Sequence, residues 1–507
     1  MKNKTFSLAI QVSMALLLAF TSCDDKEEDM GPTIDMPGVA PEVSFTALTS
    51  DNRILMYDAQ NLDSPTSSST ITGLASGEMI VSIDYRPATG QLYALSSASR
   101  LYHINENSGA ATALGAEPFS PAYSGANPSL DFNPTVDRIR LVTESGQNLR
   151  LHPELGTVVA TDGSINGGEN PRIGAVAYTN SFSGTTSTTL YDIDFEQDKL
   201  YKQVPPNDGG LEEVGDLDVD FEGTGDMDIN PDNSVALAVN RNEDESRLYT
   251  IDLSSGKAMW VGTFSEPVVS LAFKTNPIAY ATDADNILYR FDPTNPNPIA
   301  VDIMGLKEGE MITGLDFRPV NGQLLAISNM SQLYSVNPSS GAVSAIGTAL
   351  DPMVMGDFIG FDFNPTVDRI RLITENGQNL RLHPDLGTVV AVDGSLNPGS
   401  PMASGAAYTQ NFAGATATAL YVVDAQNDML YQVSPPNDGV LVEIGALGID
   451  ITDDNGFDIG GTSDMAYGVF TVGGAPGVYS VNLMSGAATK VADLNFTPTS
   501  MALGLGF

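Results

Sequence analysis

The sequence predicts an all-β protein, a β-propeller built of about ten four-stranded blades in two homologous halves. The first observation is a passage of 34 residues, Asp131 to Ser164, that recurs from Asp362 to Ser395 with 30 positions identical. A repeat at about half the chain length indicates a duplicated unit. The second observation is that short runs of β-forming residues lie between Gly, Pro, Asn and Asp, while no window carries a helical apolar period of useful length.

One stretch of about forty residues shows the layout of a single blade. We expect strands at residues 311–317, 323–328, 332–336 and 342–346, with turns at Arg318–Gly322 and Asn337–Gly341. Four short antiparallel strands in this length are typical of a propeller blade.

The first strand of each blade carries a recurring phrase, an aspartate between apolar residues that often precedes Arg-Pro or Asn-Pro. Its aspartates are Asp84, Asp131, Asp228, Asp316, Asp362 and Asp458. Alanine replaces the aspartate at Ala177, Ala272 and Ala407, and the nine centres lie 44 to 51 residues apart. This spacing matches one blade per repeat.

The two ends of the chain predict ring closure. Residues 45–49 and 54–58 match the second and third strands of a blade, and residues 499–507 resemble an unpaired first strand, so we expect strand pairing to close the edges. Two arrangements remain open, a single ten-bladed ring with pseudo-two-fold symmetry and two five-bladed propellers in which residues 268–273 close the first. The join Lys274–Pro277 spans at most about 14 Å, which slightly favours the single ring.

The N-terminus has the pattern of an export signal. Lys2 and Lys4 precede a mostly apolar run, residues 6–20, which suits a signal peptide and is short for a membrane span. Cys23, the only cysteine, follows this run and resembles the lipidated cysteine of Gram-negative bacterial lipoproteins, although Phe20 stands where an aliphatic residue is usual. The predicted segments are a signal peptide (1–22), an acidic, proline-containing tether (23–42) and two propeller repeats (43–275 and 276–507).

Charge narrows the class of partner. The chain has 63 acidic and 23 basic residues and a formal net charge of −40. Such a surface repels phosphate backbones, so nucleic acid is not an expected partner. Membrane contact is expected only through the N-terminal lipid. With one cysteine, no internal disulfide is available, so stability must come from burial and strand pairing.

The sequence resembles a bacterial family of unknown function, numbered 4394, in two tandem copies. The motifs that carry the resemblance are FNPTVDRIRL at 132–141 and 363–372, GQNLRLHP at 146–153 and 377–384, and Pro-Pro-Asn at 205–207 and 435–437. The resemblance covers nearly all of residues 43–507. It implies a propeller-like exported protein and supplies no activity.

The repeated passage also holds the strongest candidate binding site. Two of the three histidines and a dense group of arginines occur there, and guanidinium groups bind planar acids bidentately. The candidate residues are Asp137, Arg138, Arg140, Asn148, Arg150 and His152, with their copies Asp368, Arg369, Arg371, Asn379, Arg381 and His383. The alternative, which we favour, is a structural lattice of buried arginines paired with acids such as Asp131 and Asp137.

The six aspartates of the recurring phrase form a second candidate site. They could line a central channel and bind calcium through oxygen ligands. We favour hydrogen bonds to the backbone instead, so no cofactor is expected and calcium stays open. Zinc spacing, nucleophile elbows and phosphate loops are absent from the sequence.

Together these features predict a non-catalytic binding or scaffold protein of the cell envelope. We expect it to be lipid-anchored in the outer membrane, with exposure at the cell surface as a further option, and to bind a small molecule, a glycan or a protein. The alternative is an enzyme that acts on an acidic glycan or ester at the propeller axis, with His152 and His383 as acid or base.

Overall fold

The computed structural model describes residues 37–507, and the predicted signal peptide and Cys23 lie outside this part of the chain. The ten sheets of these described residues are all four-stranded and antiparallel, which confirms the predicted blades. The blade expected at residues 311–346 is formed by β24 (Ile312–Arg318), β25 (Gln323–Ser328), β26 (Leu333–Val336) and β27 (Val343–Ile346). In the described residues the helical structure consists of two short 3-10 turns, η1 (Pro206–Asp208) and η2 (Pro436–Asp438), and no helix there could span a membrane.

The first five blades form one closed ring. Their strands, from the innermost outward, are β20 (Val268–Ala272), β1 (Ser44–Thr49), β2 (Arg53–Asp58) and β3 (Ser67–Thr70); β4 (Ile80–Tyr85), β5 (Leu92–Ser96), β6 (Leu101–Ile104) and β7 (Ala111–Ala113); β8 (Ser129–Asn133), β9 (Arg138–Val142), β10 (Asn148–His152) and β11 (Thr157–Thr161); β12 (Ile173–Tyr178), β13 (Leu190–Asp194), β14 (Lys199–Gln203) and β15 (Leu211–Asp216); β16 (Thr224–Ile229), β17 (Ala236–Asn242), β18 (Glu245–Ile251) and β19 (Ala258–Thr263). The inner strands β4, β8, β12, β16 and β20 contact one another in a cycle.

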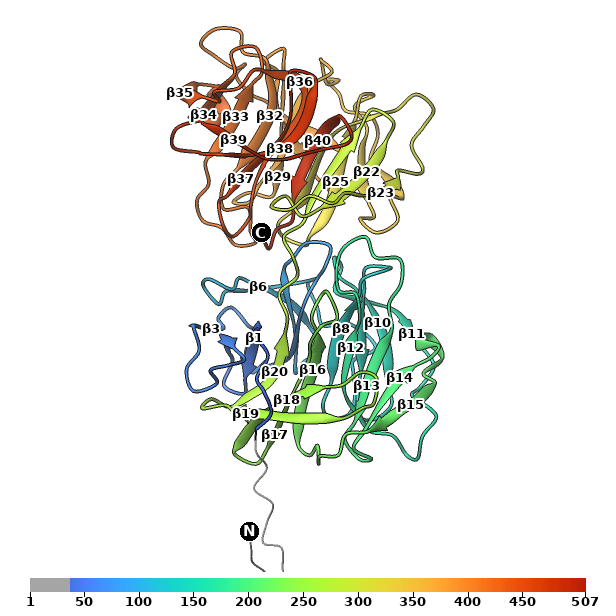
Figure 1. The fold of residues 1–507 in the computed structure, drawn as a ribbon. Helices are drawn as coiled ribbons and strands as arrows, with labels where there is room; N and C mark the ends of the chain where they lie inside the picture. The colour runs from blue at the N-terminus through green and yellow to red at the C-terminus, as the bar shows by residue number, and fades with distance from the viewer. Residues whose placement is uncertain (1–36) are drawn as a thin grey trace, which may run out of the picture. The chain divides into compact units, whose positions relative to one another are not determined.

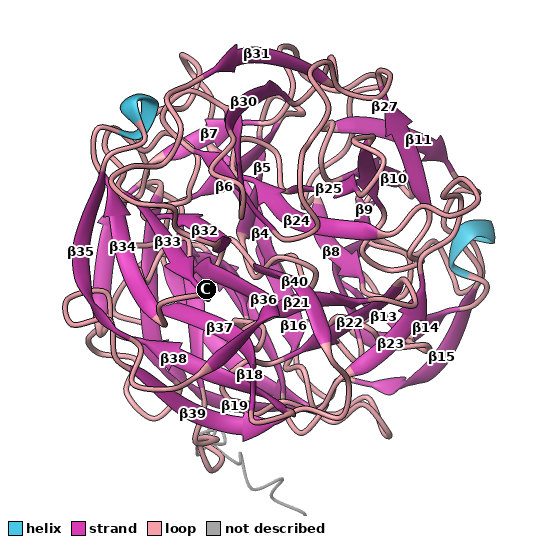
Figure 2. Ribbon diagram, turned by 90° about the horizontal axis from the view of Figure 1, so that it is seen from above, coloured by secondary structure: helices cyan, strands magenta, loops and turns pink. Residues whose placement is uncertain are grey.

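The second ring repeats this order with the chain's last strand in the closing position. Its blades are β40 (Pro498–Leu503), β21 (Ala279–Asp283), β22 (Ile287–Phe291) and β23 (Ile299–Asp302); β24 to β27; β28 (Ile359–Asn364), β29 (Arg369–Thr374), β30 (Asn379–His383) and β31 (Thr388–Val392); β32 (Ala403–Tyr408), β33 (Leu420–Asp424), β34 (Met429–Val433) and β35 (Leu441–Ala446); β36 (Ile451–Ile459), β37 (Ala466–Val472), β38 (Ala475–Val481) and β39 (Ala488–Asp493). Figure 1 shows the two groups of strands, and in Figure 2 β4, β24, β36 and β40 lie near the centre while β11, β15, β31 and β35 lie at the rim.

The preference for a single ten-bladed ring is therefore wrong, and the alternative of two five-bladed propellers is the observed arrangement. β20 pairs with β1, Ala47 opposite Leu271, and β21 pairs with β40, Ala281 opposite Met501. The short join at 274–277 connects two blades in different rings and does not form a hairpin between paired strands. Its length is compatible with either role, so it could not decide the topology.

The hydrophobic core lies between neighbouring blades. One cluster joins Tyr93 and Leu95 of β5 to Leu130, Phe132 and Ile139 of the next blade. Each blade thus buries both faces against its neighbours, which gives strands of nearly continuous apolar sequence. The framework holds side chains rigidly at the blade boundaries, and both candidate sites lie there.

Candidate functional site: arginine clamps and axial aspartates

Arg140 is a buried clamp between the third and fourth blades of the first ring. It lies on β9 and is 2% exposed. Its Nη1 donates to Asn148 Oδ1 and to Asp162 Oδ2, each at 2.7 Å, and its Nη2 donates to Asn207 Oδ1 at 2.7 Å. Asn207 belongs to η1 of the fourth blade. The guanidinium group therefore joins two strands of one blade to a turn of the next.

The neighbouring side chains complete the clamp. Asn148 Nδ2 donates to the carbonyls of Gly163 at 3.0 Å and Pro206 at 2.9 Å. Arg150 forms a bidentate pair with Asp162 at 2.7 and 2.9 Å and is half-buried. Few donors or acceptors in this cluster are left for a ligand.

The second ring reproduces the clamp. Arg371 donates to Asn379 at 2.7 Å, to Asp393 at 2.6 Å and to Asn437 at 2.8 Å. Arg381 pairs with Asp393 at 2.8 and 3.0 Å. The near-identity of the two passages thus accompanies near-identical hydrogen bonding in both propellers.

The acid partners of Arg140 and Arg371 differ from those expected. Asp162 and Asp393 hold the arginines, whereas Asp131 accepts a hydrogen bond from the backbone N–H of Tyr178 at 3.1 Å. Sequence reasoning also missed Asn207 and Asn437. The available signal was repetition, because Asp162 lies near the end of the repeated passage and Asn207 ends a Pro-Pro-Asn phrase that occurs in both halves.

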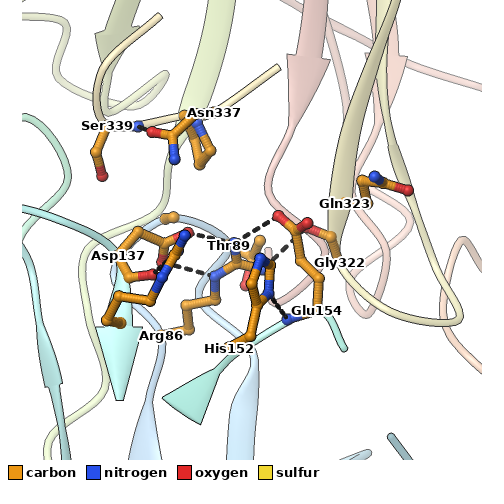
Figure 3. Close-up of polar contacts among 12 residues, drawn as sticks. Arg86, Thr89, Asp137, His152, Glu154, Gly322, Gln323, Asn337 and Ser339 are labelled. Carbon is orange, nitrogen blue, oxygen red and sulfur yellow. Dashed lines mark hydrogen bonds and ion pairs between the residues drawn. The ribbon is translucent and has the colours of Figure 1, made fainter. Parts of the chain in front are cut away.

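Asp137 takes part in a different clamp, with Arg86 of the second blade (Figure 3). Arg86 is fully buried, and its Nε donates to Asp137 Oδ1 at 2.8 Å while Nη2 bonds Asp137 Oδ2 and, at 3.2 Å, Glu154 Oε1. Its Nη1 donates to the carbonyl of Gly322 at 2.9 Å. Asp137 sits in the left-handed region at φ 51°, in the turn that precedes β9.

The second ring keeps the counterpart of this clamp. Arg318 donates to Asp368 at 2.8 Å and to Asp385 at 2.6 Å. In both rings the arginine comes from the Arg-Pro that ends the recurring phrase. Arg138 and Arg369 each donate to a backbone carbonyl, of Asp137 and Asp368 respectively, at 2.7 Å.

The histidines lie away from the propeller axis. His152 and His383 are on β10 and β30, the third strands of their blades, and each Nδ1 accepts a backbone N–H, of Glu154 or Asp385, at 3.3 Å. Burial, aided by the charge of Arg138, lowers the pKa of His152 to about 4. His152 is therefore neutral at neutral pH.

A cavity of about 230 Å³ lies beside the first clamp. Arg138, Arg140, Arg150, Tyr178 and Asn207 are among its lining residues. Arg140 is bonded to Asn207, Arg150 is paired with Asp162, and Arg138 donates to a backbone carbonyl, so an anion there would share guanidinium groups that already have protein partners. Ligand binding by this cluster stays a prediction.

The six aspartates of the recurring phrase lie on inner strands and gather into one triad per ring. Carboxylate oxygens of Asp84, Asp131 and Asp228 lie within 4.8 Å of one another, as do those of Asp316, Asp362 and Asp458. Ala177 and Ala272 occupy the same position on the other inner strands of the first ring, and Ala407 and Ala502 do so in the second. Within residues 37–507 these triads are the groups that could hold a metal ion.

Each of these aspartates also links its blade to the next one. Asp84 Oδ2 accepts the N–H of Phe132 at 2.8 Å, and Asp228 Oδ2 accepts that of Phe273 at 2.6 Å. In the second ring Asp316 accepts the N–H of Phe363 at 2.7 Å. These contacts are hydrogen bonds to the backbone of the adjoining blade, which is the interpretation favoured from the sequence. Calcium binding stays a prediction.

Burial changes the protonation of these carboxyl groups. It raises the pKa of Asp84 and Asp131 well above the usual range, with neighbouring carboxylates adding to the effect. Burial also raises the pKa of Asp228 and Asp458 to about 7. Close carboxylates in low dielectric cannot all ionise at low cost, so protons shared within the triads would satisfy them without a metal.

The first ring has an additional buried carboxyl that the second lacks. Asp226 accepts hydrogen bonds from Ser82 at 3.1 Å, Ser129 at 2.7 Å and Ser270 at 2.5 Å. Burial raises its pKa to about 7. Gly456 stands at the matching position of the second ring, where an added Cβ would meet the backbone nitrogen of Met501 at 2.4 Å.

We expect the stability of the first ring to fall as pH rises from about 4 to about 7. In this window Asp226 keeps its proton in the folded state and loses it in the unfolded state, so folding takes up a proton. Each such proton changes the free energy of unfolding by about 1.4 kcal/mol per pH unit. Asp226→Asn should make this dependence of the unfolding free energy on pH shallower by about 1.4 kcal/mol per pH unit. Calorimetric melts at several pH values measure it.

The second ring is the internal control, because it has glycine where the first has Asp226. An unchanged slope for the first ring in Asp226→Asn would contradict the assignment.

The same melts with calcium chloride in place of EGTA test the remaining metal prediction: a rise in melting temperature that Asp316→Asn abolishes in the second ring would assign a cation to its triad.

The comparisons with known proteins agree with the duplicated layout. A model of the family described as "Domain of unknown function (DUF4394)" matches residues 53–272 and again residues 287–504. No curated protein gives a significant match. A solved structure of the Dos1 propeller is similar with 12% identity and a TM-score of 0.24, over 66% of this chain and 92% of that one. At this level the likeness carries no argument, and the strand pairing described above defines the fold.

Proposed function

The chain belongs to the DUF4394 family of domains of unknown function, in two tandem copies, and we propose that it is a lipid-anchored, non-catalytic binding or scaffold protein of the cell envelope. The observation that carries the proposal is the state of the arginine–histidine cluster. Arg140 and Arg371 are committed to protein partners, and the histidines lie off the axis. What remains is a pair of rigid rings with cavities at their blade boundaries, an arrangement suited to binding.

The enzyme alternative receives no support from this geometry. General acid–base catalysis at the axis needs a titrating group within hydrogen-bond reach of a substrate. The axial aspartates are buried, and their oxygens already accept hydrogen bonds from backbone amides. We expect the protein to show no hydrolysis of aryl esters or of uronic-acid glycosides in colorimetric assays. Turnover that disappears in a His152→Ala, His383→Ala double variant, with unchanged melting, would contradict the non-catalytic proposal.

Anchoring is proposed from the N-terminal sequence. Cys23 follows an apolar run and precedes an acidic stretch, residues 24–29. Two lipid chains or more bind a protein stably to a membrane, whereas the propeller surface is strongly acidic and has little attraction for anionic headgroups. The proposed site is the outer membrane, and exposure at the cell surface belongs to the same proposal.

We expect Cys23→Ser to move the protein from the membrane fraction to the soluble fraction and to abolish incorporation of an alkynyl fatty acid. Ser22→Ala, which keeps a small residue beside the cysteine, is the matched control and should still be labelled. A Cys23→Ser protein that still sediments with membranes and resists high salt would remove the anchoring proposal.

A further inference from the structure

Arg290 differs from the other buried arginines of the described chain. Arg86, Arg140, Arg318 and Arg371 each pair with a carboxylate. Arg290, on β22, is 5% exposed and has no carboxylate partner among residues 37–507. Its Nη1 donates to the carbonyls of Pro338 at 3.3 Å and Ser339 at 3.1 Å, and its Nε has no acceptor.

A buried guanidinium group without an acid is costly to the fold. Desolvation favours its neutral form, and burial accordingly lowers the pKa of Arg290. Neutral carbonyls offset only part of that cost, because a charged donor gains most from a charged acceptor. The Arg290 guanidinium group therefore lacks a negatively charged partner within the described chain.

The first ring shows that the framework itself does not require this arginine. Met56 occupies the matching position: it lies opposite Thr46 on β1, as Arg290 lies opposite Tyr280 on β21. The two clamps described above recur in both rings, whereas this arginine does not. The fold does not need this buried charge, and its desolvation costs stability. Its presence therefore indicates a bound ligand.

Arg290 lines a cavity of about 340 Å³. Phe182, Pro231 and Ile278 contribute apolar walls, and Asn276 and Asn297 contribute amide groups. A cavity of this volume holds a small molecule. The hydroxyl groups of Ser183, at its edge, and Tyr280 lie 2.8 Å apart, and Tyr280 also donates to the carbonyl of Ala88 at 3.0 Å.

The charges around the cavity narrow the ligand to a monoanion. Asp232 and Asp292 also line it. One oxygen of each is bonded within its own turn, to Ser234 at 2.9 Å and to Thr294 at 2.7 Å. These carboxylates repel a dianion such as phosphate more strongly than a single carboxylate. The planar guanidinium fork matches a carboxylate.

We propose that this cavity binds a small monocarboxylic acid with an apolar body, and that Arg290 receives the carboxylate group. The inference rests on the proposed binding function and gives it a ligand class. The acid's carboxylate bonds Arg290 and the amides, while its apolar part packs against Phe182, Pro231 and Ile278.

The test is isothermal titration calorimetry on the full chain in detergent, with hexanoate and phenylacetate as probes and hexanamide and inorganic phosphate as controls. We expect one site per chain for a carboxylate, weaker or no binding of the amide and of phosphate, and at least tenfold weaker carboxylate binding by Arg290→Met. Methionine is the residue that the first ring tolerates at this position. Arg247→Met, at an exposed arginine, is the matched control and should bind as the parent protein does.

A second variant protects the test against misfolding. Asn276→Asp changes an exposed residue of the join and adds a negative charge to the cavity wall, so it should weaken carboxylate binding severalfold without lowering the melting temperature. Equal binding of carboxylates by the parent protein and both cavity variants, or no binding of any probe acid, would overturn the inference. Preferred binding of hexanamide or phosphate would overturn the ligand class alone and leave the binding function in place.

Discussion

Removing residues 498–507 is expected to unfold the second propeller and leave the first one folded. β40 is the inner strand of its blade and contacts β21, β24 and β36, so its loss opens the ring at the most buried layer. Met501, Leu503 and Leu505 are each less than 5% exposed. At about 1.5–3 kcal/mol for each buried side chain, the loss is about 5–9 kcal/mol before the broken strand pairing is counted. That is comparable to the whole stability of a typical domain.

Differential scanning calorimetry separates the outcomes. The full chain should show one transition for each propeller, and the truncated chain should keep only the transition of the first. A separately expressed fragment of residues 37–274 is the control and should melt near that remaining transition. Loss of all cooperative unfolding in the truncated chain would contradict two independently closed rings, since a single ten-bladed ring opens everywhere when one inner strand is removed.

The blade pattern could be predicted from the sequence because it is local. Alternation, turn residues and the recurring aspartate phrase all act within about fifty residues, and the structure confirms the predicted blade at residues 311–346 closely. Ring closure is a long-range choice. Val268–Ala272 pairs with a strand more than two hundred residues earlier, and the four residues of the join fit either topology. No local sequence feature distinguishes its observed partner, β1, from the alternative partner, the strand that directly follows the join.

The candidate sites divide in the same way. The six aspartates were recognised as one set by their repeated surroundings, and the structure brings them together at the two axes. The acid partner of Arg140 was not recognised, because Asp162 lies on a different strand and Asn207 in a different blade. Arg290 gave no signal in the sequence: it is a single arginine in a strand whose counterpart carries methionine, and only its burial without a carboxylate partner makes it distinctive.

The last prediction concerns the repeated clamp itself. Arg140→Ala should destabilise the first propeller by about 3–5 kcal/mol, the usual cost of removing one partner from a buried ion pair. Asn148 and Asn207 would each lose their donor, and Asp162 would keep only its pair with Arg150. At about 2–4 °C per kcal/mol for a domain of this size, the corresponding transition should fall by at least about 6 °C.

Matched variants distinguish a structural role of the arginine clamps from a role in ligand binding. Arg371→Ala should lower the other transition by a similar amount, because it has the same partners in the second ring. Arg150→Ala is the control: its side chain is 32% exposed, and its loss should cost about 1 kcal/mol or less because a partly exposed ion pair contributes little. If Arg140→Ala and Arg371→Ala melted as the parent protein does, the clamps would not hold the blades together. The near-identity of the two copies of the passage would then need another explanation. Binding of an anion beside Arg138 and Arg150 would be the first one to test.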